Sequence, residues 1–383
     1  MQLLIDQQRL AKALQIVGRI VPRRPVTPIV SAVVIEAEDG GVYLRATDLQ
    51  STAQFRLEAS VHAPGSVAVL ARTLSSVVST LTDGDVVLSQ SGSGESLRLT
   101  SGAAAFRLQT LDASDVFPPP VPQGDEDAVI ETDHLIDLIS RTTFCAVDSE
   151  EHSPFAGVYV SASDGALTMA ATDSYQLAHY RLPAVIRPGR PQGDPPLEAV
   201  LPTAPLNAFA KALQSFGGGE AAVSWTARTV HFTSGSVAWS VRRLDVQYPN
   251  LSRFTGPLAG VRVEVDRDRL IEGVKQVSSI ADDASRRSLC LTVDNDRLHL
   301  FTAEQELGEA QIVIALAGDH PRRRVWLDAK RLLSALRAQP SAQVALYLSE
   351  PLAPVAVAPA DESVQFRAIL MPLRLPAAES EAV

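Results

Sequence analysis

The chain has 383 residues, of which 46% are hydrophobic and 20% are charged, and its formal net charge at pH 7 is −10. This length exceeds that of one ordinary domain, and the composition is typical of a folded globular protein, which excludes a disordered chain. The negative net charge argues against a protein that coats nucleic acid with its whole surface, but it allows a locally basic face.

The sequence shows no sign of secretion, membrane insertion or a disulfide framework. No basic flank precedes the opening apolar run, and no apolar stretch approaches the ~20 residues that a membrane span needs. Cys145 and Cys290 lack neighbours at zinc-ligand spacing, and the apolar run around Cys290 is typical of a buried position. We therefore expect a cytoplasmic protein that uses no metal or other cofactor.

The first third of the chain contains four predicted elements. An amphipathic helix is expected near residues 7–19, and an alternating strand pair over residues 40–57. A short strand followed by an amphipathic helix is expected over residues 66–81, and a closing strand over residues 104–118. The Pro-rich run FPPPVPQGDED then predicts a boundary between domains.

The same four elements recur twice more in the same order. The second copy is expected over residues 133–144, 165–182, 197–213 and 236–251. The third copy is expected over residues 266–279, 296–314, 323–339 and 363–375. This repeat predicts three similar α+β domains with antiparallel sheets, and we place them at residues 1–124, 125–253 and 254–383.

Three similar domains in one chain favour an arc. Head-to-tail contacts between two such chains either close a ring or continue as a filament. With about 9 Å between helix axes, the helices of two chains would surround a hole roughly 35 Å across. The sequence thus predicts a ring-shaped homodimer with helices lining the inside and sheets outside.

Five motifs occur in order along nearly the whole chain. They are LLIDQQRLAKALQIVGRIVPRRPVTPIV, VLARTLSSVVSTL, AATDSYQLA, VQYPNLSRF and FRAILMPLRL. Together they resemble the bacterial DNA sliding clamps, the DNA polymerase III beta subunit family. The resemblance implies a processivity factor with no catalytic site, which encircles double-stranded DNA without sequence specificity. It also implies protein partners, namely the replicative polymerase alpha subunit, the clamp loader and other clamp-binding-motif proteins, and no membrane contact.

Basic residues fall on the exposed faces of the predicted helices. On the first helix Arg9, Lys12 and Arg19 share one sector, and apolar residues occupy the opposite side. The ring hypothesis favours DNA binding by Arg9, Lys12, Arg24, Arg72, Arg141, Lys211, Lys275, Lys330 and Arg337. For each residue alone, the alternative is a charge that keeps a helix face solvated.

The resemblance also implies a hydrophobic pocket between the second and third domains, where partners insert a short peptide. Matching by motif, the pocket residues are Phe155, Thr172, Ser174, Tyr175, Gln176, Leu177, Pro249, Arg253, Phe254, Ile369, Met371, Pro372, Leu373, Arg374 and Leu375. Met and aromatic side chains adapt to varied apolar anchors, and a strand edge near the chain end can pair with an extended peptide. For Leu177 the alternative is a simple core position. Gln176 stands where clamps often carry a basic residue.

The ring interface is expected from the same resemblance. Phe106 on the closing strand of the first domain would pack against Ile280 of the partner chain, beside charges such as Arg107 and Asp282. Core burial within the first domain is the alternative for Phe106.

No catalytic constellation emerges from the sequence. The histidines lack ligand spacing, and the Gly/Ser run at residues 91–96 lacks the Lys of a phosphate loop, so it predicts a turn. Asp48 and Asp173 recur at the same place in two repeats, which indicates structural turns rather than a carboxylate pair. A second hypothesis is an accessory interaction protein with the clamp fold, motivated by Gln176 and the acidic residues 148–151.

Overall fold

The computed structural model describes residues 1–22, 28–38, 40–82, 84–90, 95–111, 126–147, 155–187, 196–280, 288–304 and 308–374. The chain separates into two compact units. The first unit contains Met1–Ile139, Ser161–Leu167 and Pro183–Leu244. The second contains Ser140–Val160, Thr168–Leu182 and Asp245–Val383.

The helices, apart from the single turn α5, lie where the amphipathic segments predict them. They are α1 (Gln7–Ile20), α2 (Ala71–Thr80), α3 (Thr132–Thr142), α4 (Thr203–Phe216), α5 (Ser252–Thr255), α6 (Arg267–Val277) and α7 (Ala329–Arg337), with the 3-10 turns η1 (Pro28–Ser31), η3 (Thr143–Cys145) and η4 (Ser278–Ile280). An aspartate precedes α1, α6 and α7, and its carboxylate accepts a bond from a backbone N–H in the first helical turn. Such a cap stabilises a helix start by about 1 kcal/mol. The cap shared by α1 and α6, the opening helices of the first and third copies, supports the repeat read from the sequence.

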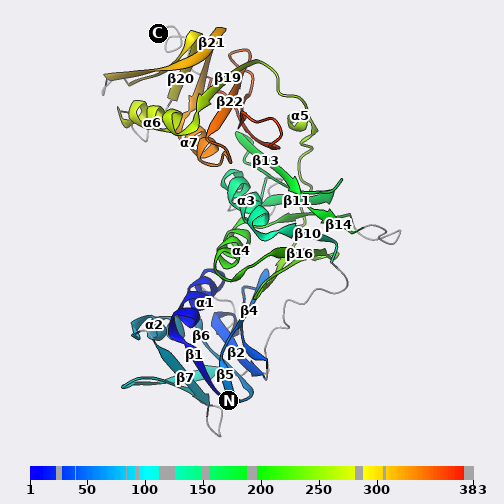
Figure 1. The fold of residues 1–383 in the computed structure, drawn as a ribbon, viewed down its shortest axis with the longest axis vertical. Coiled ribbons are helices and arrows are strands. Elements are labelled where there is room, and N and C mark those ends of the chain that lie inside the picture. The colour runs from blue at the N-terminus through cyan, green and yellow to red at the C-terminus, as the bar shows by residue number, and fades with distance from the viewer. Residues whose placement is uncertain are drawn as a thin grey trace. The chain divides into compact units, whose positions relative to one another are not determined.

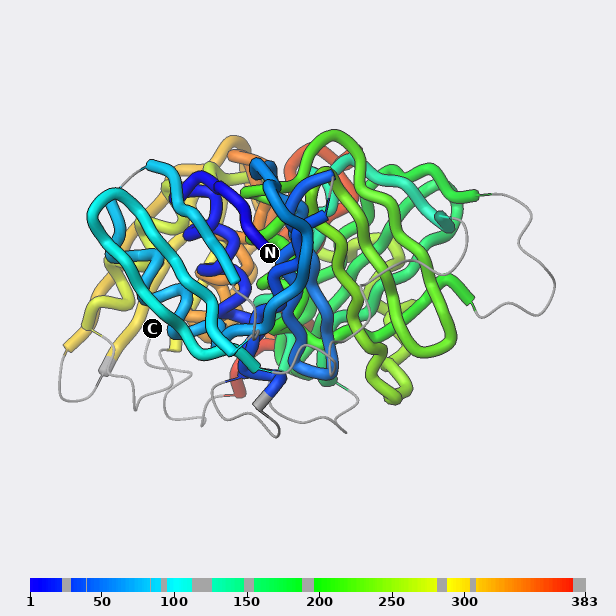
Figure 2. Tube along the Cα trace, turned by 90° about the horizontal axis from the view of Figure 1, so that it is seen from below, coloured from blue at the N-terminus to red at the C-terminus, as the bar shows by residue number. Residues whose placement is uncertain are grey.

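The first unit is built on one antiparallel sheet. Its strands are β1 (Gln2–Asp6), β2 (Ala32–Glu38), β3 (Gly41–Thr47), β4 (Ser51–Leu57), β5 (Ser60–Ala63), β6 (Gly65–Leu70), β7 (Asp85–Gln90), β8 (Ser96–Ser101), β9 (Ala104–Leu111), β10 (Ala128–Glu131), β14 (Val185–Ile186), β16 (Glu220–Trp225), β17 (Thr229–Ser234) and β18 (Val237–Arg242). Their order is β14-β10-β16-β17-β18-β4-β3-β2-β6-β9-β8-β7-β1-β5. Figure 2 shows the blue strands of residues 41–57 beside the green strands of residues 220–242, which β4 and β18 join.

Helices of the first unit cover one side of this sheet, as Figure 1 shows for α1, α2 and α4. Leu10, Leu14 and Val17 of α1 are buried, whereas Arg9 and Lys12 are exposed. The predicted amphipathic face of the first helix is therefore confirmed.

The second unit contains strands of another antiparallel sheet and a separate hairpin. In sheet order they are β13 (Gln176–Pro183), β24 (Phe366–Leu370), β23 (Val355–Pro359), β22 (Gln343–Leu348) and β19 (Val261–Asp266), with a separate hairpin of β20 (Ser288–Glu304) and β21 (Gly308–Asp328). Strands β11 (Val158–Ser163) and β12 (Ala166–Thr172) contribute residues to both units, and β15 (Glu198–Leu201) belongs to the first. The predicted α+β class with antiparallel sheets is confirmed.

Both cysteines are buried and free, as predicted for Cys290. Burial raises the pKa of the Cys145 thiol well above its ordinary value, and the nearby carboxylate of Asp173 raises it further. Such a thiol stays protonated near neutral pH and behaves as a small apolar side chain.

Candidate functional site

A hydrogen-bonded turn between β12 and β13 forms one rim of the candidate site. Thr172 Oγ1 donates to the carbonyl oxygen of Gln176 at 2.7 Å. Asp173 Oδ1 accepts bonds from the backbone N–H groups of Tyr175 at 2.9 Å and of Gln176 at 2.8 Å. Ser174 lies in the left-handed region with φ of 75°. These bonds fix the direction in which Tyr175 and Gln176 leave the turn.

The turn between β3 and β4 repeats this geometry in the first unit. Thr47 Oγ1 donates to the carbonyl oxygen of Ser51 at 2.7 Å, and Asp48 Oδ1 accepts from the backbone N–H groups of Gln50 and Ser51. Leu49 has φ of 74°, close to the value in the second copy. Both aspartates are therefore structural turn residues, and this interpretation is confirmed.

A hollow of about 230 Å³ lies beside the second turn, within the second unit. Its lining consists of Phe155, Thr172, Ser174, Tyr175, Gln176, Leu177, Pro249, Asn250, Leu251, Phe254, Ile369 and Met371. Leu177 and Ile369 belong to a buried cluster, against which Leu251 and Phe254 pack. Tyr175 and Met371 are 57% and 41% exposed. An apolar hollow with such side chains is suited to the apolar anchors of a peptide.

Most residues predicted for the pocket line this hollow. The predicted residues that do not are Arg253, Pro372, Leu373 and Arg374. Arg253 and Arg374 are exposed, and the backbone N–H of Leu373 donates to the carbonyl oxygen of Trp326 at 2.8 Å. Leu375 lies outside the described residues. Leu177 is both a core residue and a lining residue, so its two interpretations are compatible.

The predicted strand edge near the chain end is wrong for the closing strand. β24 pairs with β13 on one side and with β23 on the other, so its backbone groups already have partners. Met371 follows β24, and its N–H donates to the carbonyl oxygen of Tyr175 at 2.8 Å. We therefore expect a peptide to use the hollow rather than to extend the sheet at β24.

Two lining residues were missed from the sequence, Asn250 and Leu251. Asn250 Oδ1 accepts a bond from the backbone N–H of Ser252 at 2.9 Å, at the start of α5. Leu251 and Phe254 are three residues apart, and residues at this spacing face the same side of a helical turn. That spacing in the segment PNLSRF was the available signal.

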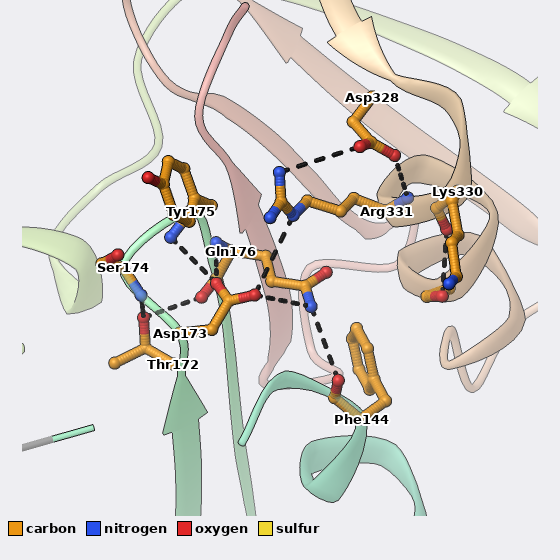
Figure 3. A network of polar contacts seen from close by, with 10 residues as sticks. Phe144, Thr172, Asp173, Ser174, Tyr175, Gln176, Asp328, Lys330 and Arg331 are labelled. Atoms are coloured by element: carbon orange, nitrogen blue, oxygen red, sulfur yellow. Dashed lines mark hydrogen bonds and ion pairs between the residues drawn. The ribbon is translucent and has the colours of Figure 1, made fainter. Parts of the chain in front are cut away.

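Polar contacts connect the turn to α7 (Figure 3). The Arg331 guanidinium lies 4.6 Å from the centre of the Tyr175 ring, and its nitrogens lie 3.9 Å from Asp173 Oδ2 and 3.8 Å from Asp328 Oδ2. Gln176 Nε2 faces two acceptors, Asp173 Oδ2 at 3.3 Å and the carbonyl oxygen of Phe144 at 3.5 Å. This rim thus holds two carboxylates and one guanidinium, with a neutral amide from Gln176.

His179 on β13 gives the second unit a pH-dependent stability. Burial, with the nearby positive charges of Arg367 and Arg181, lowers its pKa to about 4. The unfolded chain takes up this proton near pH 6.5, so it binds more protons than the folded chain between about pH 6.5 and 4. Stability is therefore retained above pH 6.5 and falls as the pH drops towards 4, by up to about 3 kcal/mol.

The variant His179→Gln should lose less stability on acidification than the parent protein. Urea midpoints at pH 7 and pH 4.5 measure this difference, with His62→Gln on the exposed strand β5 as the control. Equal acid sensitivity of the His179 variant and the parent would contradict the prediction.

Most basic residues predicted to bind DNA have exposed side chains on helices. These are Arg9, Lys12, Arg72, Lys211, Lys275, Lys330 and Arg337. Arg9 pairs with Glu58, and the Lys12 ammonium lies 5.9 Å from the centre of the Phe216 ring. Arg141 differs, because it is half-buried and Nη1 donates to the carbonyl oxygens of Ala338 and Gln339, both at 3.0 Å. Arg24 lies outside the described residues.

The residues predicted for a ring interface are accessible. Phe106 on β9 is half-buried, Arg107 is exposed and donates to Ser96 Oγ at 2.9 Å, and Ile280 is half-buried at the end of η4. Full core burial of Phe106, the alternative interpretation, does not occur. Only Thr110 and Leu111 of β9 pair with β6 within the described ranges, so residues 104–109 leave one strand edge open.

The described parts of the chain contain neither a metal-binding cluster nor a membrane-spanning helix. Among these residues no group of three or more His, Cys, Asp or Glu side chains is placed to hold a metal ion. No described helix is long and apolar enough to span a membrane.

Comparison with known proteins identifies the family. The N-terminal domain model of the DNA polymerase III beta subunit matches residues 1–119, and the central domain model matches residues 129–250. Together the two matches cover well over half of the chain. The chain belongs to the DNA polymerase III beta subunit family.

Beta sliding clamps match along almost the whole chain. One from Caulobacter vibrioides is 29% identical over 98% of this chain and 100% of its own length. A clamp structure from Pseudomonas aeruginosa, bound to griselimycin, covers 98% of this chain and 100% of its own, with 25% identity and a TM-score of 0.86. A Bacillus subtilis clamp has the same fold, with the same coverage, 21% identity and a TM-score of 0.87.

This chain is therefore a DNA sliding clamp, a processivity factor of DNA polymerase III rather than an enzyme. Family membership implies DNA, clamp-binding proteins and a second clamp chain as partners. In this clamp the Gln176 side chain bonds to acceptors of its own unit.

Proposed function

We propose that this clamp closes around duplex DNA as a head-to-tail homodimer and tethers the replicative polymerase through the hollow of the second unit. The observation that carries the proposal is the convergence of motif residues from three distant segments, such as Tyr175, Phe254 and Met371, on one apolar hollow. Chance would not gather them there. A native mass equal to two chains, together with binding of the polymerase alpha subunit, tests the proposal.

The domain organisation proposed for this ring is three clamp domains at residues 1–124, 125–253 and 254–383. Matches of the N-terminal and central domain models to residues 1–119 and 129–250 support the first two. The third domain is supported by its opening helix α6, whose aspartate cap repeats that of α1. Helices of this kind would face the DNA, with the sheets outside.

DNA contact in this proposal is electrostatic and independent of sequence. Exposed basic side chains on α1, α2, α4, α6 and α7 would attract phosphates, although the whole chain is acidic. Phosphate contacts carry no sequence information directly, so a clamp held by them can slide. Because bacterial chromosomal DNA lies in the cytoplasm, a protein that binds it would act there.

We predict that Lys12→Ala and Arg72→Ala each weaken DNA binding about two- to threefold at low salt. Each variant should also reduce the slope of log affinity against log salt by about 0.9, because one phosphate contact is lost. Fluorescence anisotropy with a labelled duplex over a salt series measures both effects. The control is Arg228→Ala, an exposed arginine in the turn between β16 and β17. A slope unchanged from the parent would contradict the DNA-facing role.

Partners of the hollow would be peptides with apolar anchor residues. The replicative polymerase alpha subunit, the clamp loader and other proteins with a clamp-binding motif are the proposed sources. Tyr175 and Met371 supply adaptable, exposed side chains at the rim, and Phe254 and Leu177 supply an apolar wall and floor.

An accessory clamp with altered partners is the second candidate function. The rim favours it, because Gln176 is neutral and the carboxylates of Asp173 and Asp328 outnumber the guanidinium of Arg331. The acidic residues 148–151 point the same way but lie outside the described residues. Loading and polymerase-stimulation assays distinguish the two functions: an accessory clamp would load onto DNA without stimulating the replicative polymerase.

A further inference from the structure

Helix α5 forms a wall of the hollow but contains little that could hold it in place. It is a single turn of four residues, none of them buried, and the side chain of its N-cap residue, Leu251, makes no capping hydrogen bond. Its local bonds include those from the N–H of Phe254 to the carbonyl oxygen of Leu251 at 2.8 Å, from the N–H of Ser252 to Asn250 Oδ1 at 2.9 Å, and from the Thr255 hydroxyl to the carbonyl oxygen of Ser252 at 3.3 Å. A helix this short is unstable alone, so its position depends on outside contacts.

Arg367 supplies such contacts from the sheet. Its Nη1 donates to the carbonyl oxygen of Phe254 at 3.1 Å and to that of Gly256 at 2.6 Å. Carbonyl groups at the end of a helix lack intrahelical partners and carry partial negative charge, so a guanidinium is a favourable donor there. One of these bonds thus holds the backbone of Phe254, whose side chain lines the hollow.

Arg367 is itself held by its strand. β24 lies between β13 and β23, and Arg367 is opposite His179 in the register of β13 and β24. The guanidinium is partly desolvated, which lowers its pKa from the ordinary value. Within the described residues it pairs with no carboxylate, and its positive charge lowers the pKa of His179. Among the described residues, its side-chain hydrogen bonds go to the carbonyl groups at the end of α5.

We infer that Arg367 is a positioning residue of the hollow, which fixes α5 and thereby places the Phe254 ring as the wall that a partner meets. This inference rests on the proposed function of the hollow. When Arg367 is lost, α5 is held mainly by the packing of Leu251, Phe254 and Leu258 on the cluster below. A partner would then have to order the wall as it binds, which lowers its affinity.

A double-mutant cycle tests the inference with the full-length protein. The variants are Arg367→Ala and Arg367→Lys, each made alone and together with Phe254→Ala, and the probe is the purified polymerase alpha subunit. The control is Arg262→Ala, a strand arginine that donates to the carbonyl oxygen of Ala360 at 2.7 Å and does not contact α5. Hydrogen exchange over residues 250–257 provides a readout that does not depend on a partner.

We expect Arg367→Ala to weaken binding about tenfold, and less than twofold when Phe254 is already alanine. Arg367→Lys should recover part of the loss, because an ammonium can reach one carbonyl but not hold both in a fixed geometry. Exchange over residues 250–257 should rise in Arg367→Ala and remain unchanged in Arg262→Ala. Equal losses in both backgrounds, or unchanged exchange, would overturn the inference.

The proposed function fails in a different way. If the parent protein did not bind the polymerase alpha subunit at all, the proposed role of the hollow would be wrong. The exchange measurement would then still decide whether Arg367 positions α5.

Discussion

Replacing Phe254 with alanine should weaken binding of the polymerase alpha subunit by about 30- to 100-fold, a loss of about 2–3 kcal/mol. Phe254 is half-buried, lines the hollow and packs on the cluster that contains Leu177 and Ile369. Truncation removes a rigid apolar wall and leaves an anchor residue of the partner facing water. Isothermal titration or surface plasmon resonance measures the change.

Leu258→Ala is the matched control for this prediction. Leu258 packs against the same cluster from the same segment, but it does not line the hollow. It should change stability in the same direction as Phe254→Ala and leave partner affinity within about twofold of the parent. Equal loss of affinity in both variants would mean that general packing, rather than the wall of the hollow, governs binding.

The second large effect is expected at the ring interface. Phe106→Ala should raise the dissociation constant of the homodimer by about 30-fold, because a half-exposed aromatic side chain in an interface contributes about 2 kcal/mol. Phe106 lies on the open edge of β9 at residues 104–109, and a strand of the partner chain could pair with this edge. Sedimentation velocity over a range of protein concentrations measures the dissociation.

Leu352→Ala is a suitable control, since Leu352 is also a large apolar residue with high exposure and lies outside the proposed interface. Its dimer should dissociate like that of the parent. A Phe106→Ala protein that remained wholly dimeric at nanomolar concentration would remove Phe106 from the interface.

Much of the fold was predictable because its signals are local. Helical periodicity located α1 and placed Leu10 and Leu14 on the buried face. Repetition of a Thr-Asp pair predicted the turns at Asp48 and Asp173, since a short carboxylate side chain bonds to the backbone within its own turn.

The features that escaped prediction depend on contacts between distant segments. The bonds from Arg141 to the carbonyl oxygens of Ala338 and Gln339 join residues almost two hundred positions apart. Arg331, which contacts the Tyr175 ring, and Arg367, which bonds to the end of α5, also join segments that are distant in sequence. The sequence pattern of an amphipathic helix does not distinguish a basic residue that faces solvent from one that bonds to the end of another helix.

The position of β24 shows the same limit. A strand edge was expected near the chain end, but the closing strand ends at Leu370, before Pro372, and lies between β13 and β23. The proline therefore terminates the strand, and the sequence does not reveal which strands pair with it. Leu251 escaped for a simpler reason, because its spacing to Phe254 was visible but α5 is only one turn long.

Retention on circular DNA tests the central proposal most directly. The protein would be loaded onto a nicked circular duplex by its clamp loader, isolated by gel filtration and measured again after the DNA is cut once. A ring held topologically should remain on the circle and leave the linear DNA within minutes, even in salt that abolishes phosphate contacts. Equal release from circular and linear DNA would contradict encirclement.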